Sequence, residues 1–518
     1  MKGITAQTLL SGTLKKFRDR VFMKIEGSEM TYGELDQRSN VLANAMANLG
    51  YGKGDKVIMI LPNSMEIAIL CLGLIKAGVT MTSLNIWLSE REISYILKDS
   101  GVRAVFVDPA FYDLVQKARG ELPHIEHVIA LGGDCPEGFI SYRQFLSGAD
   151  ATDLPLRAAP EDEFLISYTG GTTGTPKGVI QTQSSVYFNL LSHCLELNTS
   201  HDEKLLLMTP LSHAAGLLML LGMIKGATMV VEKKFDPFRA LDLIESEKIT
   251  TVFAVPTMIY VFLDILKQKK SDMSSIRQIT YGAAPISEKR LAEALEVFGP
   301  VFNQAYGLTE CPSMITVFPV ADHLKALRDP SLLQSCGRPA LMCQLRILNE
   351  SGNDVPAGKV GEITVWAPYL MKGYLNKPDE TAHAFTEEGW LRTSDMGRMD
   401  DNGYIYIVDR KKDMIISGGM NVYSIEVEEV IQRHAKVRQV SVIGIPDEHW
   451  GEAVTAIIVP AGECSEEEIL DFCKDKMAKY MEPKKVIFRE NLPLTAVLKV
   501  DKVALRAGFW SDKGRSVN

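Results

Sequence analysis

Glycine, threonine and a single lysine gather between residues 168 and 178, which read Tyr-Thr-Gly-Gly-Thr-Thr-Gly-Thr-Pro-Lys-Gly. Such a loop offers many backbone N–H groups, several hydroxyls and one cation, which is the chemistry that binds a polyphosphate. It is not the P-loop, because Pro176 stands before Lys177 and Gly178 stands after it. A flexible surface turn would have the same composition, so a functional interpretation depends on other segments of the chain.

Residues 304–310 bring an aromatic ring, a hydroxyl and a carboxylate close together in the sequence. Tyr306 is suited to stacking on a base, and Thr309 to a phosphate oxygen. Glu310 is suited to a magnesium ion that bridges phosphates. Taken singly, Tyr306 is equally a core aromatic and Glu310 a charge at the start of a helix.

Four further segments contain candidate binding or catalytic residues, each of which could instead have a purely structural role. Residues 280–285 end an expected strand with small residues against which a flat ring can lie, and Asp395 is suited to a ribose diol. Residues 417–421 form a tight turn that another molecule can pass closely. Lys499 lies in an expected loop near the C-terminus.

The length of the chain bears on the number of domains, and its net charge bears on the kind of partner it binds. The chain has 518 residues, which suggests more than one domain, and its formal net charge is −9. An acidic chain argues against nucleic acid as the main partner.

Nothing in the sequence suggests export or membrane insertion. The N-terminus has no apolar signal segment. The most apolar helical stretch, residues 65–78, contains Glu66 and Lys76 and is too short to span a bilayer. The eight cysteines include no Cys-x-x-Cys pair, so we expect a cytoplasmic protein without a transmembrane segment.

Strand-like and helix-like segments alternate through the first half of the chain, which predicts parallel sheets covered by helices. Ligands in such folds bind beyond the carboxyl ends of the strands, and the loop at 168–178 follows an apolar run of this kind. The expected elements are strands at 55–61, 79–82, 104–107 and 250–255, and helices at 65–77, 92–100 and 238–247.

The pattern changes after about residue 340. Short strands at 345–348, 361–366 and 403–408 are separated by turn residues, which predicts an antiparallel β subdomain. The charged run 409–413 is the candidate domain boundary, although a solvated turn looks the same. Beyond it we expect helices at 424–434 and 465–480, and strands at 440–445 and 453–459.

The ordered set of segments resembles the adenylate-forming superfamily of acyl-CoA synthetases, firefly-luciferase-type enzymes and nonribosomal adenylation domains. The resemblance runs from Met30 to Arg506, nearly the whole chain. It implies an α/β fold with a large N-terminal domain of doubly wound sheets plus a β subdomain (1–410). A small mobile α+β domain (411–518) follows, and the active site lies between the two.

The resemblance also implies roles for the residues of the N-terminal domain. Adenine is expected beside Tyr306, the α-phosphate beside Thr309, and Mg²⁺ at Glu310. The β- and γ-phosphates of ATP are expected at Thr169, Gly170, Gly171, Thr172, Thr173, Gly174 and Lys177. The other nucleotide-binding candidates are Gly282, Ala283, Ala284, Gln304, Gly307, and, at the ribose, Asp395 with Arg410.

For the second domain the resemblance implies a rotation about Lys412. One orientation brings Lys499 to the adenylation reaction, and the other brings Gly418 and Gly419 beside the pantetheine of coenzyme A. The implied enzyme is a carboxylic acid–CoA ligase that forms an acyl-adenylate from ATP.

His213 bears on the choice of acid. Residues 210–216 match the family segment beside the acyl carboxylate, and amino-acid-activating relatives typically place an acidic residue nearby to hold the ammonium group. His213 therefore favours a simple organic acid, unless it is a satisfied core histidine. Small residues at Ala214, Ala215 and Gly216 leave room for an aromatic ring or a medium-to-long alkyl chain.

Three positions depart from the commonest family pattern: Gly170 replaces a frequent serine, and Ser394 and Leu498 replace frequent glycines. Two other functions also stay open at this point. One is a stand-alone adenylation enzyme that loads a carrier protein, and the other, suggested only by Leu498, is a non-catalytic nucleotide-binding protein. The sequence also leaves the oligomeric state open, and a homodimer is compatible with it.

Overall fold

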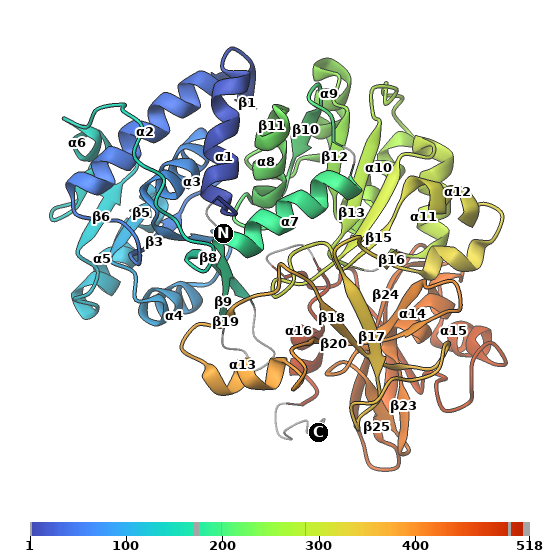
Figure 1. Cartoon of the computed structure of the whole chain (residues 1–518). Coiled ribbons are helices and arrows are strands. Elements are labelled where there is room, and N and C mark those ends of the chain that lie inside the picture. Colours follow the sequence, from blue (N-terminus) through green and yellow to red (C-terminus); the bar gives the residue numbers. More distant parts are fainter. Residues whose placement is uncertain (1–2, 170–175, 198, 285, 496–498, 511–518) are drawn as a thin grey trace.

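The computed structural model describes residues 3–169, 176–197, 199–284, 286–495 and 499–510 of the chain. Within these residues an eight-stranded sheet forms one half of the large domain (Figure 1). Its strands are parallel except for β9, which is antiparallel to both of its neighbours. In spatial order the strands are β19 (Gly373–Tyr374), β9 (Lys177–Thr182), β8 (Glu163–Thr169), β4 (Thr80–Leu84), β3 (Lys56–Ile60), β5 (Ala104–Val107), β6 (His127–Ala130) and β7 (Ile140–Ser141).

A second sheet, with nine strands among the described residues, forms the other half of this domain. Its centre is parallel and three antiparallel pairs lie at its two ends. The spatial order is β16 (Arg338–Pro339), β15 (Thr316–Phe318), β14 (Phe302–Tyr306), β13 (Gln278–Gly282), β12 (Thr251–Ala254), β10 (Lys204–Leu207), β11 (Thr228–Val231), β1 (Val21–Ile25) and β2 (Ser28–Thr31).

The two sheets share one core. Because side chains alternate across a strand, Val57 and Met59 of β3 face the shared core while Ile58 and Ile60 face the outer helices. The inner layer contains α1 (Ala6–Leu14), α2 (Tyr32–Asn48), α3 (Met65–Ala77), α7 (Gln183–Glu196) and α8 (Ala214–Lys225). The outer helices are α4 (Glu90–Ser100) and α5 (Tyr112–Glu121) on one side, and α9 (Pro237–Glu247), α10 (Pro256–Leu266) and α11 (Glu288–Phe298) on the other.

Local sequence explains where several helices begin and end. Ser89 and Glu92 form a capping box at the start of α4, and Asp236 caps α9 immediately before Pro237. Gly78 ends α3 with a φ of 75°, a conformation that glycine adopts without strain. Short elements connect the rest: α6 (Tyr142–Leu146), α12 (Val320–Ala326), α13 (Pro378–Ala384), and the 3₁₀ turns η1 (Lys15–Phe17), η2 (Pro109–Phe111) and η3 (Pro330–Gln334).

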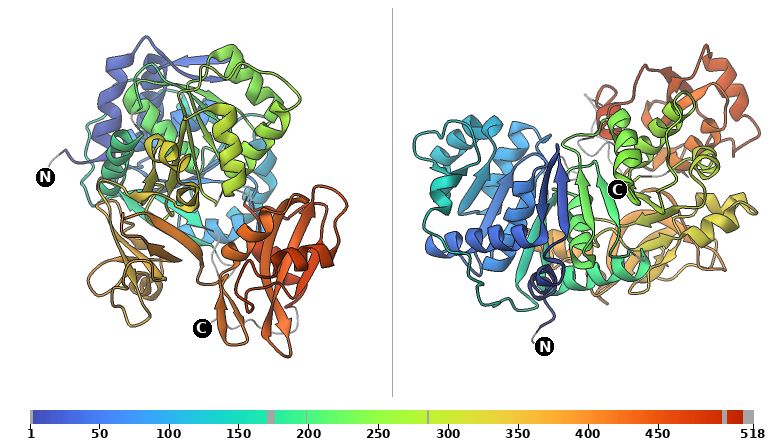
Figure 2. Two further views of the ribbon diagram at one scale, coloured as in Figure 1. Left: turned by 90° about the vertical axis from the view of Figure 1, so that its right-hand side faces the viewer. Right: turned by 90° about the horizontal axis from the view of Figure 1, so that it is seen from above.

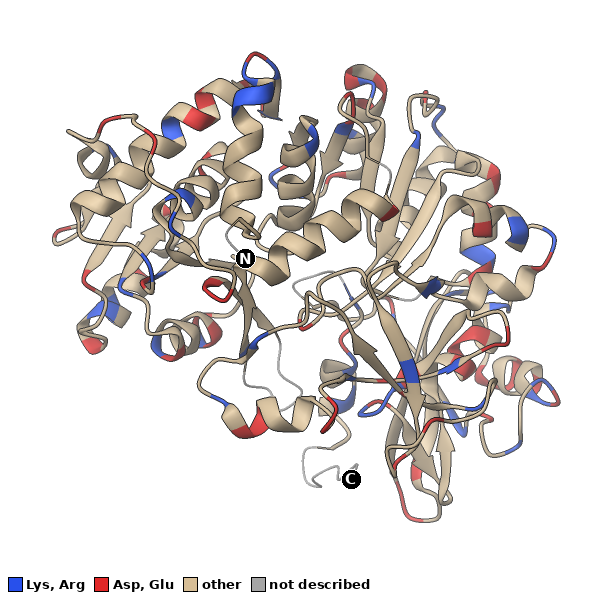
Figure 3. Cartoon of the chain, in the orientation of Figure 1, with Lys and Arg blue, Asp and Glu red and all other residues tan. Residues whose placement is uncertain are grey.

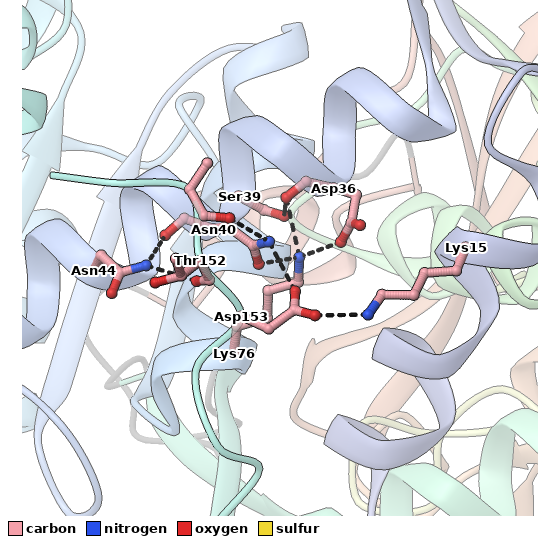
Figure 4. A network of polar contacts seen from close by, with 9 residues as sticks. Lys15, Asp36, Ser39, Asn40, Asn44, Lys76, Thr152 and Asp153 are labelled. Atoms are coloured by element: carbon pink, nitrogen blue, oxygen red, sulfur yellow. Dashed lines mark hydrogen bonds and ion pairs between the residues drawn. The ribbon is translucent and has the colours of Figure 1, made fainter.

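A buried lysine ties the inner helices together (Figure 4). The Nζ of Lys76 in α3 donates to Asp36 Oδ1 and to Asn40 Oδ1, both at 2.6 Å and both in α2. Asn40 in turn donates to Asp153 Oδ1 at 2.9 Å, and Lys15 donates to the other Asp153 oxygen at 2.6 Å. The network thus fixes the connector around residue 153 against α2 and η1.

The β subdomain and the C-terminal domain are built on separate sheets. The β subdomain is an antiparallel sheet of β17 (Gln344–Leu348), β18 (Gly361–Trp366), β20 (Leu391–Met399) and β21 (Ile405–Arg410). The next strand, β22 (Ile415–Ser417), already belongs to the sheet of the C-terminal domain. That sheet continues with β23 (Met420–Val422), β24 (Val437–Asp447), β25 (Gly451–Pro460) and β26 (Lys485–Phe488), and three helices cover it: α14 (Ser424–Gln432), α15 (Glu466–Cys473) and α16 (Lys502–Ala507).

The C-terminal domain forms a separate lobe against one end of the large domain (Figure 2). Basic and acidic residues are interspersed over both domains (Figure 3). Among the described residues, no helix is long and apolar enough to cross a membrane.

The predicted architecture is confirmed: an α/β domain with a β subdomain, followed by a smaller domain on a largely antiparallel sheet. One expected element is wrong. The helix expected at 465–480 ends at Cys473, because Lys474 leaves the helical conformation and Asp475 has a φ of 59°.

Candidate active site

Two strands frame the predicted phosphate loop. Thr169 ends β8 and Lys177 begins β9, and the two residues are the last antiparallel pair before the loop. Gly170, Gly171, Thr172, Thr173 and Gly174 lie outside the described residues. The Nζ of Lys177 pairs with the Glu380 carboxylate and lies 5.1 Å above the ring of Tyr374. Lys177 is therefore held at the carboxyl end of β8, where the fold class predicts a ligand.

The loop after β14 is attached to the same strands. The Tyr374 hydroxyl donates to Glu310 Oε1 at 2.8 Å, and the Gln181 side chain donates to the Thr309 carbonyl oxygen at 3.1 Å. The Met371 N–H donates to the Glu310 carbonyl oxygen at 2.8 Å. Burial and the negative charge of Glu310 raise the pKa of Tyr374, so its hydroxyl stays a donor at neutral pH.

Tyr306 and Asp395 meet where the second sheet approaches the β subdomain. The Tyr306 hydroxyl donates to Asp395 Oδ2 at 2.7 Å, and Arg410 Nε lies 3.4 Å from Asp395 Oδ1. The antiparallel register of β20 and β21 places Asp395 directly opposite Arg410. Asp395 is buried, and the loss of hydration raises its pKa against the opposing effects of Arg410 and Tyr306.

At the expected adenine surface, neighbouring backbone segments lie too close together to admit a side chain at two positions. A Cβ at position 282 would lie 2.2 Å from the Ala305 carbonyl oxygen, and one at position 307 would lie 2.6 Å from the Ser313 backbone. Glycine is therefore required at both positions. Ala283 has a φ of 68°, and the Gln304 side chain accepts a hydrogen bond from the Tyr281 hydroxyl at 3.1 Å.

Lys499 reaches this site from the other domain. Its loop is closed by the Thr495 N–H, which donates to the Lys499 carbonyl oxygen at 2.7 Å. Burial and, to a smaller extent, the positive charge of Arg410 lower the pKa of Lys499 to about 8, against the opposing effect of Asp395. Lys499 thus interacts electrostatically with side chains of the large domain.

His213 immediately precedes α8 and interacts electrostatically with the same lysine. Part of its surface is accessible to solvent, yet loss of hydration and, to a smaller extent, the charge of Lys499 lower its pKa to about 4. The imidazole is therefore neutral at pH 7. The buried Asn85, which follows β4, places its amide nitrogen 3.5 Å from His213 Nε2.

The hinge and glycine candidates lie on the C-terminal side of β21. Lys412 follows β21, and burial lowers its pKa. Gly418 and Gly419 turn between β22 and β23 with φ values of 59° and 76°. The Gly418 N–H donates to the Trp450 carbonyl oxygen at 2.8 Å. Among the described residues, Lys499 interacts electrostatically with Asp395 and His213, whereas Gly418 is bonded to Trp450 of its own domain.

Comparison with models of known protein families shows to which family the chain belongs. Residues 10–375 match the model of the AMP-binding enzyme family, and residues 426–499 match its C-terminal domain. The chain belongs to the AMP-binding enzymes. This confirms the predicted membership of the adenylate-forming superfamily.

Named relatives of this AMP-binding enzyme cover nearly its full length. It is 38% identical to the medium/long-chain-fatty-acid–CoA ligase FadD8 of Mycobacterium tuberculosis, over 98% of this chain and 91% of the relative. It is 33% identical to a feruloyl-CoA synthase of Amycolatopsis, over 93% and 94% of the two chains. It also resembles the ATP-bound structure of MatB from Rhodopseudomonas palustris, with a TM-score of 0.89 and 28% identity over 98% and 99% of the chains.

Three residues of this AMP-binding enzyme were missed by the sequence reasoning. Tyr374 and Glu380 contact Glu310 and Lys177, and Asn85 contacts His213. They are separated by 64, 203 and 128 positions from these partners, so no local spacing relates them. Only the pairing of β19 with β9 could have shown that Tyr374 and Lys177 are neighbours.

Proposed function

We propose that this enzyme ligates a carboxylic acid to coenzyme A at the expense of ATP, through an acyl-adenylate. The observation that carries the proposal is the position of Lys499. This lysine of the C-terminal domain interacts electrostatically with Asp395 and His213 of the large domain, the residues of the expected ribose and acyl sites. Both the family membership and the CoA-ligase relatives support it.

In the first half-reaction a carboxylate oxygen of the acid attacks the α-phosphorus, and the bond to pyrophosphate breaks. The acid is already ionised at neutral pH, so no general base is needed. Two anions must approach, and charge develops on the α-phosphoryl oxygens. We propose that Lys499, cationic at pH 7, offsets that charge, and that neutral His213 donates a hydrogen bond near the carboxylate.

In the second half-reaction the thiol of coenzyme A loses its proton to solvent, its sulfur attacks the acyl carbon, and AMP leaves with the electrons of the mixed-anhydride bond. This step needs room where Lys499 lies. We propose that the domain boundary falls between residues 410 and 411, and that rotation at Lys412 replaces Lys499 by the turn at Gly418 and Gly419. The change of sheet between β21 and β22 supports a boundary at this point.

Magnesium fits the donor set at Glu310. The carboxylate and the Thr309 hydroxyl are hard oxygen ligands of the kind Mg²⁺ prefers. Tyr374 donates to Oε1 of the Glu310 carboxylate, and among the described residues no hydrogen bond or ion pair engages Oε2, which we propose as the oxygen that a cation would bind. Bound there with ATP, Mg²⁺ would neutralise phosphate charge.

The acid belongs, in this proposal, to the medium/long-chain fatty acids or the aromatic acids. His213 in place of an acidic group supports an acid without an ammonium group, and the two relatives above carry names of both kinds. We further propose a cytoplasmic location, and a homodimer is compatible with this proposal.

The test is a panel of fatty and aromatic acids incubated with ATP and coenzyme A, read out as AMP formation and as acyl-CoA by mass spectrometry. The proposal expects acid-dependent AMP together with a CoA thioester. Acid-dependent ATP–pyrophosphate exchange without transfer to free CoA, but with transfer to a carrier-protein thiol, would instead establish the carrier-loading alternative. No exchange with any acid would contradict both.

A further inference from the structure

Lys177 already has an anionic partner in the protein. Its Nζ pairs with the Glu380 carboxylate, while the Lys177 and Glu380 side chains are 20% and 39% exposed. The Tyr374 ring supports the same ammonium group from one side, at 5.1 Å. The lysine expected to hold the terminal phosphates is therefore charge-balanced before any nucleotide is present.

The backbone delivers Glu380 to this position. Tyr374 in β19 pairs with Val179 in β9, two residues beyond Lys177. The Tyr374 N–H donates to Thr381 Oγ1 at 2.9 Å, and this hydroxyl donates to the Lys377 carbonyl oxygen at 2.8 Å. These bonds join the start of α13 to β19, so Glu380 projects toward Lys177 from a defined element.

The Glu380 carboxylate is ionised over the whole neutral range. Its hydrogen bond with Lys177 lowers its pKa, and Lys377, whose Nζ lies 3.3 Å from the other carboxylate oxygen, acts in the same direction. Lys377 is 23% exposed. When Lys177 changes partner, Lys377 is therefore in place to keep the released carboxylate neutralised.

We propose that Glu380 is the exchangeable counterion of Lys177, displaced by the β- and γ-phosphates of ATP or by free pyrophosphate. The inference rests on the proposed function, in which Lys177 holds these phosphates. A carboxylate and a phosphate then compete for one ammonium group. The competition weakens ATP binding and equally favours the departure of pyrophosphate after adenylation.

The test is the substitution Glu380→Gln, which keeps the shape of the side chain and removes its charge. Asp379→Asn is the matched control, because Asp379 is exposed and lies in the same first turn of α13. Binding of inorganic pyrophosphate, MgATP and AMP to the full-length chain is measured by calorimetry at low salt. Because an exposed ion pair is weak, pyrophosphate and MgATP should bind about two- to fivefold more tightly to Glu380→Gln.

AMP separates this role from a general effect of charge or structure, since AMP has no β- or γ-phosphate. Its affinity should be unchanged in Glu380→Gln, and Asp379→Asn should leave all three affinities unchanged. Weaker or unchanged pyrophosphate binding in Glu380→Gln would overturn the proposal, as would an equal gain for AMP or an equal gain in Asp379→Asn. Glu380→Ala, which also lacks the charge, must show the same selective gain.

Failure of the proposed function would give a different result. Wild-type protein that binds pyrophosphate and MgATP but forms no AMP with any acid would refute the ligase and leave the counterion role standing. Wild-type protein that binds neither ligand would overturn both.

Discussion

Lys76 and Lys499 lie in different regions of the molecule, and burial lowers the pKa of both. Lys76, between α2 and α3, has three oxygen partners within 3.1 Å: Asp36 Oδ1, the Asp36 carbonyl oxygen and Asn40 Oδ1. Lys499, between the two domains, makes no ion pair with any described residue. It interacts only at longer range with Asp395, and Arg410 repels it.

The difference separates a structural lysine from one that we propose to be catalytic. The protein itself supplies all the anionic and polar partners of Lys76, so its charge stabilises the packing of the inner helices. The partners of Lys499 are incomplete, and in the proposed reaction ATP and the acid complete them. A cation held ready for charge that develops later costs no reorganisation during the reaction.

The sharpest test of the contrast is Lys499→Ala. Loss of a preorganised charge at the α-phosphoryl oxygens should lower the adenylation rate by about 10²- to 10³-fold. The rate is measured as acid-dependent ATP–pyrophosphate exchange. Thioester formation from pre-made acyl-adenylate should be nearly unchanged, and thermal stability should not fall. Equal loss in both half-reactions would show that Lys499 does not act specifically in adenylation.

Lys76→Met should have the opposite signature. It leaves the Asp36 carboxylate, 21% exposed, without its cation, which should cost about 3 kcal/mol of stability. Urea denaturation measures this cost, and the exchange rate per folded molecule should stay near that of wild type. Asp36→Asn combined with Lys76→Met removes both charges and should recover part of the loss. A large kinetic defect in folded Lys76→Met would erase the distinction between the two lysines.

The sequence predicts local elements and motifs better than it predicts contacts between distant segments. Residues 65–77 were predicted as a helix with the observed bounds; Ser64 precedes its first turn, and Gly78 ends it with a φ of 75°. Segments 304–310 and Asp395 could be found because their residue types carry the chemistry locally. The contact of Tyr374 with Glu310 could not, since it depends on the pairing of β19 with β9 across nearly two hundred residues.

The structure also explains one departure from the family pattern. Ser394, where glycine is frequent, has a φ of 59°, a conformation in which glycine is unstrained and serine is not. Two of its backbone groups hold it there: its N–H donates to Glu362 Oε1 at 3.2 Å, and its carbonyl oxygen accepts from the Lys411 N–H at 2.9 Å. The equivalent question for Leu498 lies outside the described residues.

The pH dependence of adenylation should report the titration of Lys499. Lys499 loses its charge as pH rises through about 8. The kcat/KM for ATP should therefore fall about tenfold between pH 7 and pH 9. Bound anions stabilise the cation, so the fall in kcat should lie at higher pH. His213, with a pKa of about 4, adds no transition near pH 6.5. A kcat/KM profile that stays flat to pH 10 would contradict the assigned environment of Lys499.

Tyr374→Phe should have a smaller effect, which is confined to the Mg²⁺ concentration that the exchange reaction requires. The variant keeps the ring beside Lys177 and removes only the hydroxyl that donates to Glu310. Because one hydrogen bond to a charged group is lost, the Mg²⁺ concentration for half-maximal exchange should rise about five- to tenfold. The kcat at saturating Mg²⁺ should change little. A lower kcat that excess Mg²⁺ does not restore would mean that Tyr374 does not act by positioning Glu310.

The smallest expected effect concerns what holds Lys499 in place. Arg433 of the C-terminal domain and Glu288 of α11 form an ion pair at 3.2 Å, the one salt bridge between residues 1–410 and 411–510 among those described. The pair is 55% and 31% exposed, so Arg433→Ala should slow adenylation only about two- to threefold. Thioester formation from pre-made adenylate should be unchanged or slightly faster, because the lost contact belongs to the orientation that presents Lys499. The exchanged pair, Arg433→Glu with Glu288→Arg, should restore the wild-type ratio of the two half-reactions, whereas a ratio that stays altered would assign the effect of Arg433 to its own domain.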